Sequence, residues 1–216
     1  KAFATRYDPG VMAYQIWDEP NLSAAWGNGL INPSAYLALL KQTRAAIREA
    51  SPNAITLLAG LAPTVEQSEV NLAPQIYLRK LYELGGKDFF DVAAAKPYGF
   101  DIPPDDRRVD AGVLNFSHVI LMREEMARNG DADKAIWLTQ FGWNAQLPNW
   151  KGEASPWSGV SEAAQADYTR SAIARAAGEW SWAGAMFVRA AQPAAPAASA
   201  EWGFALYDQS GQPRPV

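Results

Sequence analysis

Continuous hydrophobic stretches alternate along the chain with stretches whose hydrophobic residues recur every three to four positions. The continuous stretches have the length and composition of strands buried on both faces, and cover residues 11–17, 54–61, 90–95, 135–139 and 183–188. Helical patterns lie between them, at about 33–51, 72–84, 112–129 and 161–180. Strands separated by helices predict βαβ units and a parallel sheet, so the expected class is α/β.

Boundary signals support this division. Asn32 and Pro33 suit the N-cap and first turn of a helix, and Ser161 is a second N-cap candidate. The segment 144–160 is rich in Pro, Gly, Asn and Trp, which predicts a long functional loop. Residues 190–200 are mostly Ala and Pro and predict an exposed loop, followed by a short extended segment at 202–207.

Composition restricts the function classes. The 216 residues, 49% of them hydrophobic, suffice for one domain, 1–216. A formal net charge of −4 argues against nucleic-acid binding, and no apolar run is long enough for a membrane span. The chain has no cysteine and one histidine, His118, which we expect to be structural. We therefore expect no thiolate or multi-histidine metal site, and no cofactor.

Polar residues gather where the predicted strands end. The three segments are Ile16-Trp17-Asp18-Glu19-Pro20-Asn21, Lys96-Pro97-Tyr98-Gly99 and Thr139-Gln140-Phe141-Gly142-Trp143. Catalytic groups collect at such strand ends in parallel α/β barrels. For the acidic pair alone, a solvated turn is an equal alternative, since turns favour such residues.

Together, these segments resemble signatures of clan A glycoside hydrolases, retaining enzymes with a (β/α)8 barrel. The first resembles the segment after strand four, the second that of strand six and the third that of strand seven. The ending, Trp202 to Leu206 with Gln212 to Pro215, is similar to the segment after strand eight. The subgroup with β-xylosidases and exopolysaccharide glycosidases is the most similar.

The resemblance implies a TIM-barrel glycosidase topology of which this chain holds strands four to eight. It implies that Glu19 occupies the acid/base position and Gln140 the nucleophile position. It also implies carbohydrate contacts for five residues: Asp18, Asn21, Lys96, Tyr98 and Trp143.

Three positions depart from the family. The retaining mechanism needs two carboxyl groups about 5–5.5 Å apart. Gln140 has an amide, which cannot form the glycosyl ester. Asp18 stands where the family has asparagine, and Lys96 where it has histidine. These two charges are opposite, so we expect an ion pair between them; the alternative is that Lys96 extends to solvent.

Several further residues have two interpretations. Tyr98 and Trp143 are expected to line the cleft, the alternative being packing under a loop. Trp17 is expected in the core. Sugar stacking and loop packing are equally compatible with three loop tryptophans: Trp26, Trp150 and Trp157. Arg189 ends the last strand, where the family often has an aromatic platform, and Glu124 and Glu125 predict a solvated helix face.

Two functions remain open. One is a non-catalytic glycosidase-like protein that acts as a binding or assembly subunit. The other is a retaining β-glycoside hydrolase inactivated by a Glu-to-Gln substitution at position 140. Carbohydrate is the expected partner in both, outside the cell or at its surface. Strands one to three lie outside this sequence, are supplied by another chain, or are lost with the open barrel edges covered by other subunits.

Overall fold

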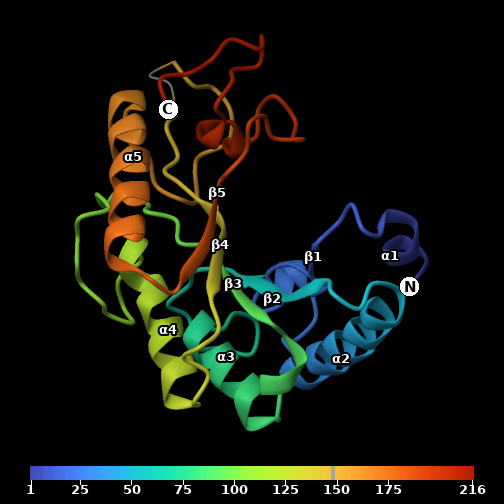
Figure 1. The fold of residues 1–216 in the computed structure, drawn as a ribbon. Coiled ribbons are helices and arrows are strands. Elements are labelled where there is room, and N and C mark those ends of the chain that lie inside the picture. Colours follow the sequence, from blue (N-terminus) through green and yellow to red (C-terminus); the bar gives the residue numbers. More distant parts are fainter. Residues whose placement is uncertain (147–148) are drawn as a thin grey trace. The chain divides into compact units, whose positions relative to one another are not determined.

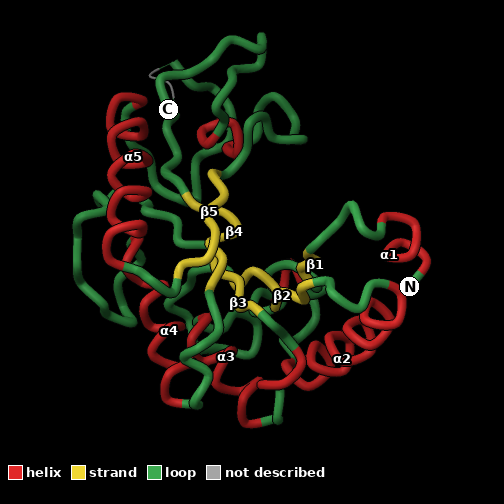
Figure 2. Tube along the Cα trace, viewed as in Figure 1, coloured by secondary structure: helices red, strands yellow, loops and turns green. Residues whose placement is uncertain are grey.

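The computed structural model describes residues 1–146 and 149–216, and it divides into two compact units. Unit 1 comprises residues 1–96 and 120–137, and unit 2 comprises residues 97–119 and 138–216. The five strands follow one another in the order β1-β2-β3-β4-β5, and helices alternate with them (Figures 1 and 2). The predicted α/β class is confirmed. Part of the expected functional loop 144–160, Leu147 and Pro148, lies outside the described residues.

The described part of the chain contains α-helices, strands and short 3-10 turns. The α-helices are α1 (Ala2–Tyr7), α2 (Pro33–Ala50), α3 (Pro74–Glu83), α4 (Val119–Arg128) and α5 (Glu162–Glu179). The strands are β1 (Ala13–Gln15), β2 (Ile55–Leu61), β3 (Val92–Ala95), β4 (Ile136–Phe141) and β5 (Ala183–Val188). The 3-10 turns are Ser23–Ala25, Lys87–Phe89, Phe116–His118 and Ala200–Phe204.

Parallel pairing holds the sheet of unit 1 together. Strand β1 pairs with β2 in the register Ala13 with Ile55, and β2 pairs with β3 in the register Leu61 with Ala95. The register between β2 and β3 shifts by one residue between Leu57 and Gly60. Strand β2 is buried along almost its whole length, as its continuous hydrophobic sequence predicts.

Side-chain hydrogen bonds from α2 fix the sheet of unit 1. The Asn32 side chain caps α2 by accepting a hydrogen bond from the Ala35 amide, as predicted. The buried Tyr36 hydroxyl donates to the Ile16 carbonyl at 3.1 Å and accepts from the Ala59 amide at 2.7 Å. Tyr36 therefore joins the segment after β1 to β2, immediately before the acidic residues.

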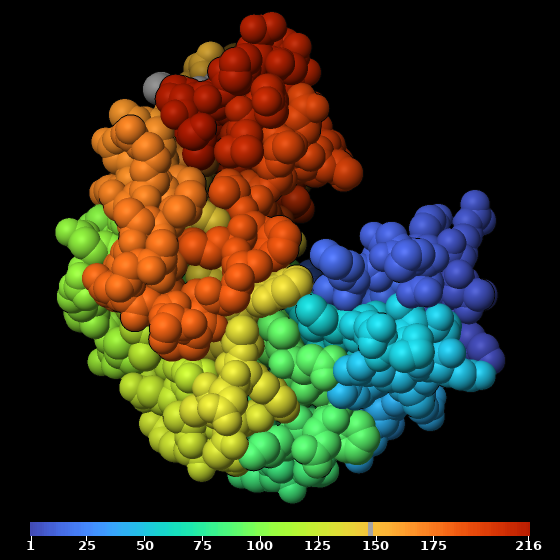
Figure 3. Space-filling view, viewed as in Figure 1, coloured from blue at the N-terminus to red at the C-terminus, as the bar shows by residue number. Residues whose placement is uncertain are grey.

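In unit 2, α5 packs close to β5 and to the C-terminal segment. The Ser161 side chain caps α5 through the Ala164 amide, as predicted. Arg214 pairs with Glu162 at 2.9 Å, which places the end of the chain beside the start of α5. Figure 3 shows these two segments, red and orange, next to one another on the surface.

Three boundaries differ from the expectation. The predicted strand 11–17 is regular only over β1, because the backbone turns into the left-handed region at Trp17. Helix α4 begins seven residues later than predicted, after a 3-10 turn that includes the buried His118. The predicted extended segment 202–207 begins instead in the 3-10 turn Ala200–Phe204, which Ser199 caps through the Glu201 amide.

No helix in the described ranges is both long and apolar enough to cross a membrane.

Candidate functional site

The acidic pair of unit 1 is held in an unusual backbone conformation beyond the end of β1. Asp18 forms a parallel bridge with Gly60 of β2, and the Glu19 amide donates to the Gly60 carbonyl at 3.0 Å. Trp17 and Glu19 have φ angles of 71° and 50°. Left-handed conformations cost non-glycine residues about 1 kcal/mol or more, and such strain concentrates at functional sites. The strand ladder thus overrides local preference to fix both carboxylates.

Both carboxylates contact a single buried ammonium group, and we name these three side chains the carboxylate–lysine cluster (Asp18, Glu19, Lys96). Lys96 Nζ lies 2.6 Å from Asp18 Oδ2 and 2.8 Å from Glu19 Oε1. The Lys96 side chain is only 2% exposed, whereas those of Asp18 and Glu19 are 52% and 25% exposed. The predicted ion pair is confirmed, and the alternative that Lys96 extends to solvent is wrong.

Glu19 is a second partner of Lys96 that the sequence did not indicate. The charge change at two family positions suggested Asp18 alone. The left-handed turn at Glu19 brings the neighbouring carboxylate to the same ammonium, and backbone strain of this kind has no signature in the sequence.

Asn21 does not fit the predicted substrate contact. Its side chain is completely buried, and its amide donates to the Ala62 and Leu72 carbonyls and accepts from the Ala62 amide, each at 2.9 Å. These bonds fasten the segment after the acidic pair to the end of β2. The geometry gives Asn21 a structural role.

Unit 2 contains a second group, the Gln140 cluster (Tyr98, Gln140, Trp157, Arg189, Glu201, Phe204). Gln140 lies in β4, which extends two residues beyond the predicted strand. The Tyr98 hydroxyl donates to Gln140 Oε1 at 2.5 Å, and Arg189 Nη1 donates to the Tyr98 hydroxyl at 2.5 Å. The amide oxygen at the expected nucleophile position is therefore held by a phenol.

Arg189 fills the space beside Gln140. Its guanidinium carbon lies 4.8–5.4 Å from the ring centroids of three aromatic residues, Tyr98, Trp157 and Phe204. It also pairs with Glu201 at 3.0 Å. Burial alone would lower the pKa of Arg189, but Tyr98 and Glu201 raise it. Arg189 is thus surrounded by three aromatic rings and one carboxylate.

The sequence indicated only part of this cluster. Arg189 was identified as a departure from the family. Glu201 and Phe204 were missed because the 3-10 turn that presents them was expected to be extended.

Four predicted environments are corrected. Trp143 is fully buried, with its indole N–H bonded to the Ile102 carbonyl at 2.8 Å, so it packs under a loop and does not line a cleft. Trp17 is 49% exposed and not in the core. Glu125 is buried against Arg79 and is not on a solvated face. Tyr98 is also buried, although its hydroxyl still contacts Gln140.

The loop tryptophans have different environments. Trp26 packs between Trp17 and Tyr36, and Trp157 packs against Tyr98 and Phe204, so both favour the packing interpretation. The remaining member, Trp150, lines a separate pocket of unit 2.

Among the described residues, no group of three or more His, Asp or Glu side chains could hold a metal ion.

Comparison with known proteins establishes the fold. No family model matches the sequence, and no curated protein matches it. A family 39 glycoside hydrolase from the gut symbiont Bacteroides cellulosilyticus WH2 has a similar structure, with a TM-score of 0.67 and 19% identity over 99% of this chain and 40% of that chain. A monomeric β-xylosidase from Caulobacter crescentus CB15 gives a TM-score of 0.61 and 18% identity over 99% and 43%.

A glucosidase from Croceicoccus marinus gives a TM-score of 0.62 and 13% identity over 93% of this chain and 37% of that chain. This chain therefore spans about 40% of the length of the first solved structures it matches. At such low identity the likeness concerns the fold alone. The chain has the topology of part of a TIM-barrel glycosidase, as predicted.

Proposed function

We propose that this chain is a glycosidase-like protein that does not hydrolyse glycosides with its own residues and acts as a carbohydrate-binding or assembly subunit. The observation that carries the proposal is the position of Lys96 Nζ, within 2.8 Å of both Asp18 and Glu19. Gln140, which lies in unit 2, supports it independently.

The contact with Lys96 opposes the role of Glu19 as an acid. A general acid must present a proton to the leaving oxygen of the glycoside. Glu19 Oε1 already accepts a hydrogen bond from an ammonium group, and that ammonium is buried and cannot turn away to solvent. Glu19 Oε1 is therefore engaged by Lys96 within unit 1.

Gln140 opposes the nucleophilic step. Covalent catalysis by a retaining glycosidase requires a carboxylate oxygen to attack the anomeric carbon. The amide of Gln140 carries no charge, and its oxygen is bonded to the Tyr98 hydroxyl. Position 140 therefore lacks the chemical form that the nucleophilic step needs.

One observation favours the second candidate, a retaining β-glycosidase blocked only at position 140. Tyr98 and Arg189 both direct donors at Gln140 Oε1, at 2.5 and 3.3 Å. A glutamate oxygen would accept the same two bonds, since glutamine and glutamate differ little in shape. In this candidate, Tyr98 and Arg189 are donors that suit a glutamate at position 140 and now bind the amide of Gln140.

Activity of revertants separates the two candidates. We would assay a panel of aryl β-glycosides with the parent protein, with Gln140→Glu, and with the triple variant Asp18→Asn/Lys96→His/Gln140→Glu. Gln67→Glu, at an exposed position in unit 1, is the control for the added charge.

We expect no turnover by the parent or by Gln140→Glu, with circular dichroism confirming that both are folded. Turnover by the triple variant alone would assign the inactivity to all three departures and support the proposal. Turnover by the single variant Gln140→Glu, with no turnover by the parent, would establish the second candidate instead. Turnover by the parent would reject both.

A further inference from the structure

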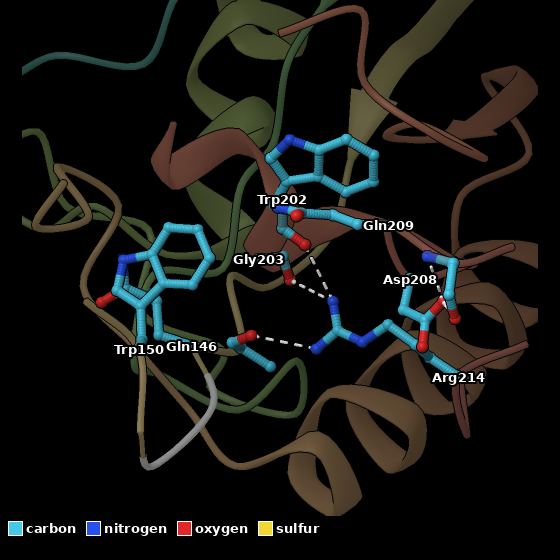
Figure 4. A pocket seen from close by; sticks show the side chains of 9 residues that line it. Gln146, Trp150, Trp202, Gly203, Asp208, Gln209 and Arg214 are labelled. Atoms are coloured by element: carbon cyan, nitrogen blue, oxygen red, sulfur yellow. Dashed lines mark hydrogen bonds between the residues drawn. The ribbon is translucent and has the colours of Figure 1, made fainter. Parts of the chain in front are cut away.

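Unit 2 contains a pocket of about 330 Å³, formed by the segment after β4 and the C-terminal segment. Two tryptophans, Trp150 and Trp202, form part of its wall (Figure 4). Pockets that bind small ligands begin at about 300 Å³ and combine apolar walls with a few polar groups. This pocket therefore has room for one small ligand.

The two indoles are held in place before any ligand binds. Trp150 Nε1 donates to the Glu153 carbonyl at 2.8 Å, and Trp202 Nε1 donates to the Pro196 carbonyl at 3.2 Å. A side chain at Gly152 would overlap the Trp150 ring, so that ring lies directly against the backbone. Because both polar edges are bonded to backbone, the apolar ring surfaces are what remains for a ligand.

Hydrogen-bond acceptors stand beside these rings. Gln146 and Gln209 use their amide nitrogens on the carbonyls of Glu153 and Ala197. Asp208 Oδ1 accepts bonds from Ser210 and the Gln212 amide. Within the described ranges, neither amide oxygen nor Asp208 Oδ2 has a hydrogen-bond partner. Three side-chain oxygens are thus available to hydroxyl groups.

The single cation of the pocket wall is already committed. Arg214 donates to the carbonyls of Ala145 and Trp202 (Figure 4). Its side chain is 8% exposed and pairs with Glu162. The Glu162 carboxylate compensates its charge. With the Asp208 carboxylate and no uncompensated cation among the residues that line it, the pocket favours a neutral ligand over an anion.

The pocket is separate from the Gln140 cluster of the same unit. Trp202 and Phe204 are two residues apart on one 3-10 turn, yet only Trp202 lines the pocket, whereas Phe204 packs against Tyr98 and Trp157. A ligand here would contact none of the residues assigned to catalysis by the resemblance.

We propose that this pocket binds one neutral pyranose unit of a saccharide, with an apolar sugar face on the indoles of Trp150 and Trp202 and its hydroxyls donating to Gln146, Asp208 and Gln209. The choice of a saccharide rests on the proposed function, and it locates the binding that this function requires. A flat aromatic ligand would stack on the indoles but would give the three acceptor oxygens no donor. Leaving these acceptors unsatisfied lowers the binding free energy.

Ligand-observed NMR tests the proposal with methyl β-glycosides of glucose, xylose, galactose and mannose, and with methyl β-glucuronide as the anionic comparison. The variants are Trp202→Ala, Trp202→Phe and Gln140→Ala. Trp17→Ala, an exposed tryptophan of unit 1, is the matched control for loss of an indole.

We expect at least one neutral glycoside to bind the parent, with about tenfold or greater weakening in Trp202→Ala and partial recovery in Trp202→Phe. Binding should be unchanged in Trp17→Ala and in Gln140→Ala. Thermal unfolding of each variant verifies that the fold is kept.

Loss of binding in Gln140→Ala with retention in Trp202→Ala would overturn the pocket while leaving the proposed function intact. Preference for the glucuronide would overturn the neutral ligand class. If none of the glycosides binds, this inference is overturned. The revertant assay decides separately whether the protein lacks hydrolytic activity.

Discussion

The Lys96 side chain is buried, whereas the side chains of its two partners, Asp18 and Glu19, are partly exposed to solvent. This asymmetry decides which substitution is costly. Removing the ammonium leaves two carboxylates that water can still hydrate, because Asp18 and Glu19 are 52% and 25% exposed. Removing both negative charges leaves a buried ammonium without compensation, which costs about 3–5 kcal/mol.

We therefore predict that Asp18→Asn/Glu19→Gln lowers the free energy of unfolding by about 3 kcal/mol, and Lys96→Met by only about 1 kcal/mol. Urea unfolding at neutral pH measures both. Lys1→Met, at an exposed position, is the control and should change little. A larger loss in Lys96→Met than in the double variant would contradict the asymmetry.

At the scale of single residues, charge is predictable from the sequence and backbone strain is not. The opposite charges at Asp18 and Lys96 were sufficient to predict their contact. The exposure of Trp17 was not predictable, because a hydrophobic residue at the end of an apolar run is normally placed in the core. The left-handed conformation at Trp17 reverses that expectation.

At the scale of elements, the loop after β3 depends on a close contact with Trp143. A Cβ atom at Gly99 would overlap the buried Trp143 ring, which also packs against Phe116 and Tyr168. The indole cannot move outward without losing its bond to the Ile102 carbonyl. Glycine is required here by space and not by a left-handed φ angle.

Gly99→Ala should therefore lower the free energy of unfolding by about 3 kcal/mol, the upper end of what overpacking costs. Gly159→Ala is the matched control, since a Cβ atom there would meet nothing within 4 Å. Thermal and urea unfolding should show the control unchanged or slightly stabilised. Equal effects of the two substitutions would disprove the contact with Trp143.

Elements with local signals were predicted well, and those specified by tertiary contacts were not. The caps at Asn32 and Ser161 fixed the starts of α2 and α5, because a side-chain oxygen and a nearby amide suffice for a cap. The 3-10 turn Ala200–Phe204 has a cap at Ser199, but it also receives a bond from Arg214 at the Trp202 carbonyl. That partner is twelve residues away, beyond any local pattern.

At the scale of the whole molecule, paired acids with lowered pKa values occur in both units. In unit 1, Asp91 joins Arg44 and Arg48 of α2 to the Thr56 amide of β2. Burial alone would raise the pKa of Asp91, but hydrogen bonds from Arg44 and the Thr56 amide lower it. Burial alone would likewise raise the pKa of Glu125, but Arg79 lowers it.

In unit 2, two acids with lowered pKa values pair with exposed arginines. Hydrogen bonds from Arg108 lower the pKa of Asp106 to about 2, and bonds from Arg107 do the same for Glu179. The guanidinium groups of Arg107 and Arg108 are more than 60% exposed, so solvent screens both pairs. Protonating Asp106 and Glu179 should therefore cost unit 2 little stability.

Unit 1 should consequently lose stability first as the pH falls. An acid whose pKa is lower in the folded protein stabilises the fold above its unfolded pKa, near 4, and this contribution disappears as the pH falls towards the folded pKa. As the pH falls below about 4, hydrogen exchange should therefore increase in peptides covering β2 and α2 before those covering α5. Asp91→Asn should destabilise unit 1 by about 1.5–3 kcal/mol at pH 7 and weaken its pH dependence, because the titrating group is gone. Earlier exchange in α5, or an unaltered pH dependence in Asp91→Asn, would mean that these paired acids do not control the acid stability of the two units.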